Sequence, residues 1–273
     1  MIATRVMKLT RNSSWTQLAS VPMKFATYHP QGMVKVGGTL LISSVEVKTR
    51  TEGVGHLFKS DLQGNLIASR TLGEGSLYHP GGIDYDGKHL WVPVGEYRPD
   101  SRSIVYRVDP ATLDAIEVLR VEDHIGAVAL NTDDNTLHGV SWGSRRFYRW
   151  TLDREGRVTN ASAKLADIRT LNASHYIDYQ DCKYVGGRQM LCTGVAEIRR
   201  SAGAEPFRLG GMDIVNLADG RPVHQAPILL WTPSGLDMTH NPVWVEPTAD
   251  GLRAYFLPED DRSTLYIFEV SQP

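Results

Sequence analysis

Histidine and carboxylate side chains recur along this chain in a repeated arrangement. A histidine, or in one repeat a tyrosine, stands at the start of a β-rich run, and in four repeats an acid follows 17 to 19 residues later. Imidazole and carboxylate groups together suit Fe, Mn, Zn or Co, and near neutral pH they also act as general acid and base. The repeated positions are His29, His79, His124, Tyr179 and His240, and the acids are Glu46, Glu96, Glu197 and Glu259.

The segments around these residues predict the fold, because they are copies of one unit. Residues 25–32 read FATYHPQG and residues 75–82 read GSLYHPGG, and each precedes a glycine-containing turn and an apolar run. Such turns between apolar runs indicate β-hairpins. Five units follow one another at intervals of roughly 45–60 residues, a spacing that, with four short strands in each unit, is typical of a β-propeller.

The two ends of the chain together supply the last blade. The fifth unit ends after its third strand, whereas WTQLASVP precedes the first unit just as NLIASRTL precedes the second. We therefore expect an all-β, five-bladed propeller of four-stranded antiparallel blades, forming one domain over residues 1–273. The expected blades are 25–73, 75–122, 123–170, 176–232 and 239–271, and strand 14–22 closes the ring. Helix should be limited to a turn at 110–114 or in the 199–209 loop.

This architecture predicts where the repeated side chains meet. The start of an inner strand and the end of the next strand lie at the same end of an antiparallel hairpin. His29, His79, His124 and His240 should therefore converge at one rim of the axis, as metal ligands or acid–base groups. The glutamates would orient the imidazoles from a second shell: Glu46, Glu96, Glu197 and Glu259. The alternative is that the histidines join neighbouring blades by hydrogen bonds.

Other residues on the same rim add polar and aromatic groups. Arg98, Arg102, Arg145 and Arg146 follow second strands, and arginine binds carboxylate or phosphate bidentately. They favour an anionic substrate, although solvated loop arginines would look the same. Glu96, Arg98 and Asp181 are candidate catalytic residues, with Asp181 expected to point into the channel. The candidate substrate-binding residues are Trp142, which replaces the acid of the third repeat, Arg145, Arg146, Tyr179 and Gln180.

Composition excludes several classes of function. Lys and Arg total 29 against 31 Asp and Glu, which leaves a net charge of −2 and no basic surface for nucleic acid or an anionic membrane. No apolar run could span a bilayer and no secretory signal is visible, so we expect a cytoplasmic protein. Its cysteines, Cys182 and Cys192, should then be free thiols. No nucleotide- or flavin-binding motif is present.

Several motifs resemble those of a bacterial and fungal family of uncharacterised β-propeller domains. They are YHPGGIDYDG at 78–87, EYRP at 96–99, YRVDP at 106–110, GVSWGSR at 139–145, DYQDCKY at 178–184 and PEDD at 258–261. The resemblance spans nearly the whole chain and implies a propeller fold. More distantly, the chain is similar to gluconolactonase-like and strictosidine-synthase-like propellers, which have six blades and hold calcium with Glu, Asn and Asp.

Two functions follow from these observations. The first is an enzyme with a histidine-rich axial site that hydrolyses a small polar or anionic metabolite, or eliminates from it, with a divalent Fe, Mn or Zn ion. The second is a non-catalytic propeller that binds a small molecule or a protein with Trp91, Trp142 and Trp244 together with the arginines. Bound metal or a deep axial pocket would favour the first.

Overall fold

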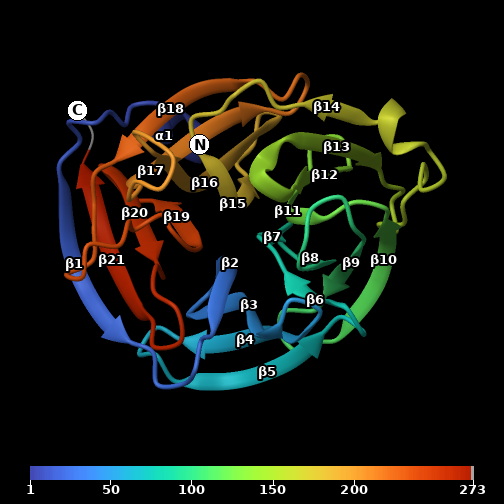
Figure 1. The fold of residues 1–273 in the computed structure, drawn as a ribbon, viewed down its shortest axis with the longest axis horizontal. Coiled ribbons are helices and arrows are strands. Elements are labelled where there is room, and N and C mark those ends of the chain that lie inside the picture. Colours follow the sequence, from blue (N-terminus) through green and yellow to red (C-terminus); the bar gives the residue numbers. More distant parts are fainter. Residues whose placement is uncertain (272–273) are drawn as a thin grey trace.

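The computed structural model describes residues 1–271 and shows a ring of five four-stranded antiparallel sheets, as predicted (Figure 1). Each sheet runs from an inner strand at the axis to an outer strand at the edge of the ring. The first blade contains β2 (His29–Val36), β3 (Thr39–Thr49), β4 (Glu52–Asp61) and β5 (Leu66–Leu72). The second contains β6 (Leu77–Pro80) with β7 (Asp84–Tyr85), then β8 (Leu90–Glu96), β9 (Ser103–Val108) and β10 (Ala115–Val121).

The other three blades repeat this order. The third contains β11 (Ile125–Asn131), β12 (Thr136–Ser141), β13 (Arg146–Thr151) and β14 (Arg169–Leu171). The fourth contains β15 (Asp178–Tyr184), β16 (Gln189–Ile198), β17 (Phe207–Asn216) and β18 (Pro222–Ile228). The fifth contains β19 (Val243–Pro247), β20 (Gly251–Phe256), β21 (Thr264–Ser271) and β1 (Trp15–Pro22), which comes from the other end of the chain.

The closure of the ring by the N-terminal strand is confirmed. Strand β1 pairs antiparallel with β21, with Trp15 opposite Val270 and Val21 opposite Leu265. Figure 1 shows the two strands side by side, one blue and one red. The last blade thus gains its fourth strand, and the first and last parts of the chain are joined by main-chain hydrogen bonds.

Burial follows the position of a strand within its blade. All seven residues of β8 are buried, because a second strand is covered by the neighbouring blades on both faces. Outer strand β5, by contrast, buries only Leu72 among its seven residues. Apolar residues of adjacent blades pack together between the sheets, so that each blade contributes to the cores on both of its sides.

Backbone contacts also join the innermost segments of the second and third blades. The Gly82 N–H donates to the Gly126 carbonyl at 2.8 Å, and the Val128 N–H donates to the Gly82 carbonyl at 3.2 Å. These bonds form a parallel bridge between Gly82 and Ala127. Gly81 makes the approach possible, since a Cβ at this position would lie 2.1 Å from the Gly126 oxygen.

A buried ion pair fills the axis below these bonds. The Asp181 carboxylate lies beside the Lys183 ammonium and accepts the backbone N–H groups of Met33 at 3.0 Å and Ile83 at 3.1 Å. Both charged side chains are nearly inaccessible to solvent. Asp181 therefore connects the inner strands of the first, second and fourth blades, and we call Asp181, Lys183 and Asp84 the axial cluster.

Asp84 connects the second blade to the inner strands of the third and fourth blades in the same way. Its Oδ2 accepts the backbone N–H groups of Leu130 at 2.9 Å and Tyr184 at 3.1 Å. Burial raises the pKa of Asp84 to about 7 and that of Asp181 to about 6, while the nearby Lys183 charge opposes both shifts. Two carboxylates thus hold the first four blades in register around the axis.

Two expectations about local structure are wrong. A short helix, α1 (Ile2–Val6), precedes the propeller, and it buries Ala3 and Val6 among apolar residues of the fourth and fifth blades. The expected free thiols are joined instead, since Cys182 and Cys192 form a disulfide. They lie directly opposite each other in the β15–β16 register, with Cα atoms 4.1 Å apart.

The remaining loops follow the sequence expectations more closely. Residues 110–112 form a turn, and residues 199–206 form a loop before β17 begins. Two short 3-10 segments occur, at Trp142–Ser144 and Leu165–Asp167. Within residues 1–271, no helix has the length and apolar character that crossing a membrane requires.

Candidate functional site

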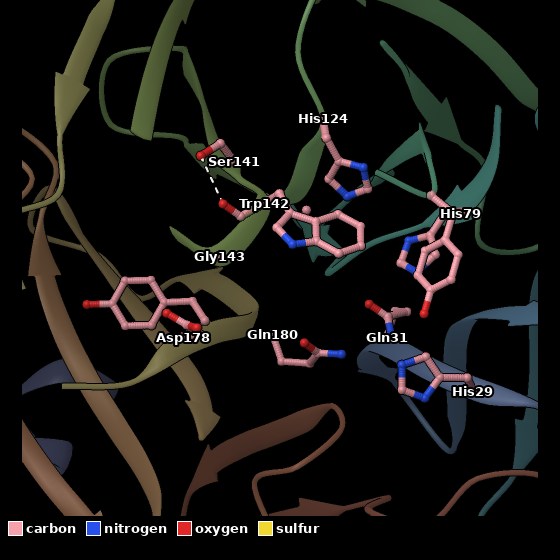
Figure 2. Close-up of a pocket in the computed structure, with 12 residues that line it drawn as sticks. His29, Gln31, His79, His124, Ser141, Trp142, Gly143, Asp178 and Gln180 are labelled. Atoms are coloured by element: carbon pink, nitrogen blue, oxygen red, sulfur yellow. Dashed lines mark hydrogen bonds between the residues drawn. The ribbon is translucent and has the colours of Figure 1, made fainter. Parts of the chain in front are cut away.

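A cavity of about 270 Å³ opens at the end of the axis where inner strands begin and second strands end. It is the rim at which the repeated histidines were expected. Figure 2 shows His29, Gln31 and His79 on one side of this cavity and Asp178 with Gly143 on the other. The lining residues are His29, Gln31, His79, Tyr97, His124, Gly126, Ser141, Trp142, Gly143, Asp178, Tyr179 and Gln180.

Three of the four histidines line this cavity because of their place in the strands. His29 is the first residue of β2, His79 lies within β6, and His124 immediately precedes β11. His240 precedes β19 but does not line the cavity. The structure thus brings the histidines of the first three blades into the cavity lining, and His240 lies outside the lining but close enough to act electrostatically on Asp260 and His29.

The geometry does not show the expected metal site. Among residues 1–271, no three His, Cys, Asp or Glu side chains are placed to hold one ion together. The rings of His79 and His124 lie 5.5 Å apart, centroid to centroid, at an angle of 60°. The cavity instead presents imidazoles and an aromatic wall.

The expected pairing of each histidine with the glutamate of its own repeat is wrong. Glu46 accepts a hydrogen bond from His56 at 3.2 Å, and Glu96 pairs with Arg98 at 2.6 Å and with Arg102. The other two glutamates also have different partners. Glu197 pairs with Arg199 and Arg208, and Glu259 accepts hydrogen bonds from Thr264 and Tyr266.

An aspartate takes the place expected of a glutamate beside His29. The Nδ1 atom of His29 lies 2.8 Å from Oδ1 of Asp260, and the Asn241 amide donates to the same oxygen at 2.9 Å. Burial acts to raise the pKa of Asp260, but its hydrogen bonds with His29 and Asn241 and the nearby His29 and His240 side chains together lower it. The ionised Asp260 accepts the Nδ1 proton of His29, so that Nε2 keeps its lone pair.

His124 is held in the corresponding tautomer by the main chain. Its Nδ1 lies 2.6 Å from the Glu96 carbonyl oxygen, which can only accept, so Nδ1 carries the proton and Nε2 is unprotonated. Burial lowers the pKa of His124 to about 4, against the effect of this hydrogen bond. His124 is therefore a neutral imidazole at neutral pH.

His79 is also neutral and is the least satisfied of the three. Burial, followed by the neighbouring charges of His124 and His29, lowers the pKa of His79 well below its ordinary value. Its Nδ1 is buried and has no hydrogen-bond partner. The ring stacks on Tyr97, with centroids 4.8 Å apart and planes within 10°.

Aromatic rings form one continuous wall around these histidines. Trp142 lies 4.7 Å from His124, 5.7 Å from Tyr97 and 6.0 Å from His79 between ring centroids. Trp142 is 37% exposed, whereas His79 and His124 are buried. In Figure 2 its indole ring reaches into the cavity between His124 and Gln180. A flat apolar surface is thus available beside the imidazoles.

The rim arginines do not face the cavity as free cations. Arg145 pairs with Asp178 at 2.6 Å, and Arg146 pairs with Asp100 at 2.6 Å and Asp123 at 3.0 Å. Both line a neighbouring cavity of about 410 Å³ that shares Ser141, Trp142, Gly143 and Asp178 with the first. Each arginine thus has its charge balanced by an aspartate of the rim.

Of the remaining candidate residues, two line the cavity and one lies outside it. Gln180 lines the cavity, and Tyr179 contributes to its wall while its hydroxyl donates to the buried Asp213 at 2.9 Å. Asp181 lies in the axial cluster, not in the cavity lining. The expectation that Asp181 points into an open channel is wrong, because backbone N–H groups and Lys183 occupy its oxygens.

Trp91 and Trp244 are core residues instead of ligand-binding groups. Trp91 is 1% exposed and donates its indole N–H to Asp86 at 2.8 Å. Trp244 packs between two apolar clusters of the core. Of the three tryptophans proposed for a binding surface, Trp142 alone reaches the cavity.

Sequence reasoning missed several residues at the site. Gln31 follows His29 by two positions, but the β2–β3 register is irregular between Pro30 and Gly32, so simple strand alternation could not have indicated its direction. Asp260 belongs to the acidic PEDD motif at 258–261, which the sequence analysis gave only as a family motif. Tyr97 and Ser141 adjoin residues that were identified, but their type alone gave no signal.

Fold and cavity together define a five-bladed β-propeller with a histidine-lined, partly aromatic pocket at one end of its axis. The chain belongs to the DUF6454 family, a family of unknown function, which matches residues 1–272. No curated protein matches the chain significantly. The more distant similarity to gluconolactonase-like propellers is not shown.

Solved structures share the fold at low sequence identity. A luciferin-regenerating enzyme is 9% identical, with a TM-score of 0.51 over 94% of this chain and 98% of that chain. A tail fibre of Staphylococcus aureus phage P68 is 9% identical, with a TM-score of 0.54 over 96% of this chain and 53% of that chain. At such identities the similarity concerns the propeller fold alone.

Proposed function

We propose that this protein is a hydrolase that uses His29 as a general base on a small cyclic ester or related acyl compound bound in the axial cavity. The observation that carries the proposal is the His29–Asp260 pair at the cavity wall. Its Nδ1–Oδ1 distance of 2.8 Å fixes the imidazole so that Nε2, the basic nitrogen, is free for the cavity. A carboxylate that orients an imidazole in this way also stabilises the imidazolium formed during a reaction.

The chemistry follows from this arrangement. His29 Nε2 takes a proton from a water molecule, and the resulting hydroxide adds to the carbonyl carbon of the substrate. The tetrahedral intermediate then collapses, the ring C–O bond breaks, and the imidazolium returns its proton to the leaving alkoxide. The product is the ring-opened hydroxy acid. His29 is regenerated as the neutral base.

The rest of the cavity supports a small substrate. Its volume of about 270 Å³ lies just below the roughly 300–1,000 Å³ usual for small-molecule sites, which suits one ring with few substituents. The neutral His79 and His124 and the exposed Trp142 ring provide an apolar wall, from which bulk water is partly excluded. The base itself is half-buried, so a water molecule can reach it from the rim.

The test is hydrolysis of a panel of γ- and δ-lactones and phenyl esters, followed by acid release. We expect the wild type to hydrolyse at least one lactone and His29→Gln to be slower by about 10²–10⁴-fold. The control is His89→Gln, because His89 lies near Asp86 in the β7–β8 turn at the opposite end of the blade. This variant should keep the wild-type rate.

Two results would contradict the proposal. The first is the absence of hydrolysis across the panel, which would favour a binding propeller. The second is full activity in His29→Gln. Assays with a chelator and with added Zn²⁺ or Mn²⁺ test the metal-assisted form of the reaction, since a rate that depends on the added ion would assign the water activation to a metal instead of His29.

A further inference from the structure

The charges around the cavity differ from those that an anionic substrate needs. Of the described residues that line it, none is lysine or arginine, and Asp178 alone is formally charged apart from histidine. The nearest guanidinium, Arg145, is already bound to Asp178 at 2.6 Å. A carboxylate in the cavity would therefore lose its hydration without gaining a free cation.

The histidines do not supply the missing positive charge. Burial keeps His79 and His124 neutral by lowering their pKa values, and His29 lies against the Asp260 carboxylate, which would offset a proton that the imidazole takes up. His29 also contributes to a neighbouring cavity whose wall contains Glu46, Asp260 and Asp261. The electrostatic environment of the site is thus neutral to negative.

Two buried polar atoms of the lining have no partner. Gln31 is 4% exposed and its Nε2 donates no hydrogen bond; His79 is 5% exposed and its Nδ1 is equally unpartnered. A buried polar group without a hydrogen bond is costly, and proteins rarely keep one without a reason. Figure 2 shows both side chains on the same side of the cavity, beside His29. A ligand that brings a hydrogen-bond acceptor to Gln31 would give Nε2 the partner that it lacks.

From these observations we infer that the cavity is specific for uncharged, planar acyl compounds, whose carbonyl oxygen accepts from Gln31 Nε2 while the ring packs on Trp142. The inference deepens the proposed function and depends on it where it calls the ligand a substrate. It also replaces the anionic metabolite expected from the arginines. In the proposed reaction the same Gln31 N–H would donate to the oxyanion that forms when hydroxide adds to that carbonyl.

Three probes of nearly equal shape and different charge test this specificity. Benzamide is neutral and carries a carbonyl oxygen, benzoate is an anion, and benzamidine is a cation without an acceptor. Binding is measured by calorimetry and by quenching of tryptophan fluorescence, with Trp142→Phe assigning the optical signal. We expect benzamide to bind at least about tenfold more tightly than either benzoate or benzamidine.

Gln31→Leu tests the role of the amide. This variant should lose the preference for benzamide, so that its affinity falls by about tenfold. Its melting temperature should stay at or above that of the wild type, because the substitution removes a donor that has no partner in the free protein. A large fall in melting temperature would show that Gln31 serves the fold and would overturn its assignment to ligand binding.

Binding and hydrolysis fail independently in this design. Preferential binding of benzamide without any lactone hydrolysis would support the specificity and contradict the proposed reaction. Lactone hydrolysis together with equal or tighter binding of benzoate would support the reaction and overturn the specificity. Tighter binding of benzamidine would indicate a cationic ligand, and no binding of benzamide up to its solubility limit would also overturn the inference.

Discussion

Replacing Asp181 by leucine removes the carboxylate at the centre of the propeller. Asp181 is 1% exposed, lies beside the buried Lys183, and accepts backbone N–H groups from the first and second blades at 3.0 and 3.1 Å. In Asp181→Leu, the two N–H groups lose their acceptor and the Lys183 ammonium loses its nearest counter-charge. Asp84 remains the other carboxylate that acts on Lys183.

The expected loss of stability follows from these contacts. Removing one partner of a buried ion pair costs about 3–5 kcal/mol, and a buried N–H without an acceptor costs roughly 1–3 kcal/mol. The terms are not additive, so we expect Asp181→Leu to lose about 5 kcal/mol. The double variant Asp181→Leu/Lys183→Met removes the unpaired charge as well and should lose only about 2 kcal/mol, chiefly from the two N–H groups.

The assay is equilibrium urea denaturation of the wild type, both single variants and the double variant. Glu117→Gln serves as a control, because Glu117 pairs with Arg120 on the surface and should leave stability close to that of the wild type. The reasoning is refuted if the free energy of unfolding of Asp181→Leu lies within about 1 kcal/mol of the wild-type value. It is equally refuted if the double variant is less stable than Asp181→Leu.

Three further outcomes are expected. Deleting residues 1–22 should unfold the protein in circular dichroism, because β1 completes the last blade; a folded monomer would contradict the closure. Gly81→Ala should lower the free energy of unfolding by roughly 1–3 kcal/mol, and with it the melting temperature, since its Cβ would lie 2.1 Å from the Gly126 oxygen. Gly38→Ala, which has open space around its Cβ, should leave both unchanged. The pKa of His124 is about 4 in the folded protein and 6.5 in the unfolded chain. Between these pH values the unfolded chain binds a proton that the folded protein does not, so stability is lost as pH falls from 6.5 toward 4. In His124→Gln, the slope of the free energy of unfolding against pH over this range should be smaller by up to about 1.4 kcal/mol per pH unit. An unchanged slope would contradict the burial argument.

The fold was predictable because it is encoded in repeated local signals. The turn dipeptide Asp86-Gly87 and the apolar runs on either side of such turns recur in each unit, and strand pairing within a unit is local in sequence. The similarity of WTQLASVP to NLIASRTL even indicated the long-range pairing of β1 with β21. The helix at Ile2–Val6 was not visible, because five residues are too few to show helical periodicity and tertiary packing holds them.

The site was only partly predictable, for a geometric reason. Repeat position placed His29, His79 and His124 on one rim, since strand order determines which end of a blade a residue occupies. Partners of side chains depend on rotamers and on the neighbouring blade, which repeat alignment does not contain. Glu96 therefore pairs with Arg102 of its own blade, and His29 with Asp260 of the fifth blade.

The burial of acidic groups at the axis was also outside sequence reasoning. Alternation along β15 is interrupted by an irregular register between Tyr179 and Asp181, and whether the axis is open or filled depends on how closely the inner strands approach. Gly81 and Gly82 allow that close approach, and the backbone N–H groups it brings together occupy Asp181 and Asp84. A residue expected in a channel thus became part of the structural centre.

The most direct test of the central claim is the pH dependence of kcat/KM for the lactone that the wild type hydrolyses fastest, measured for the wild type and Asp260→Asn. The account predicts a wild-type rate that falls in acid and reaches a plateau above it, because a general base acts only when it is unprotonated. Asp260→Asn, which no longer holds Nδ1 as the protonated nitrogen, should be slower by about 10²–10⁴-fold at the plateau while the protein remains folded. A wild type that hydrolyses no lactone, or an Asp260→Asn variant with the wild-type profile, would contradict the account.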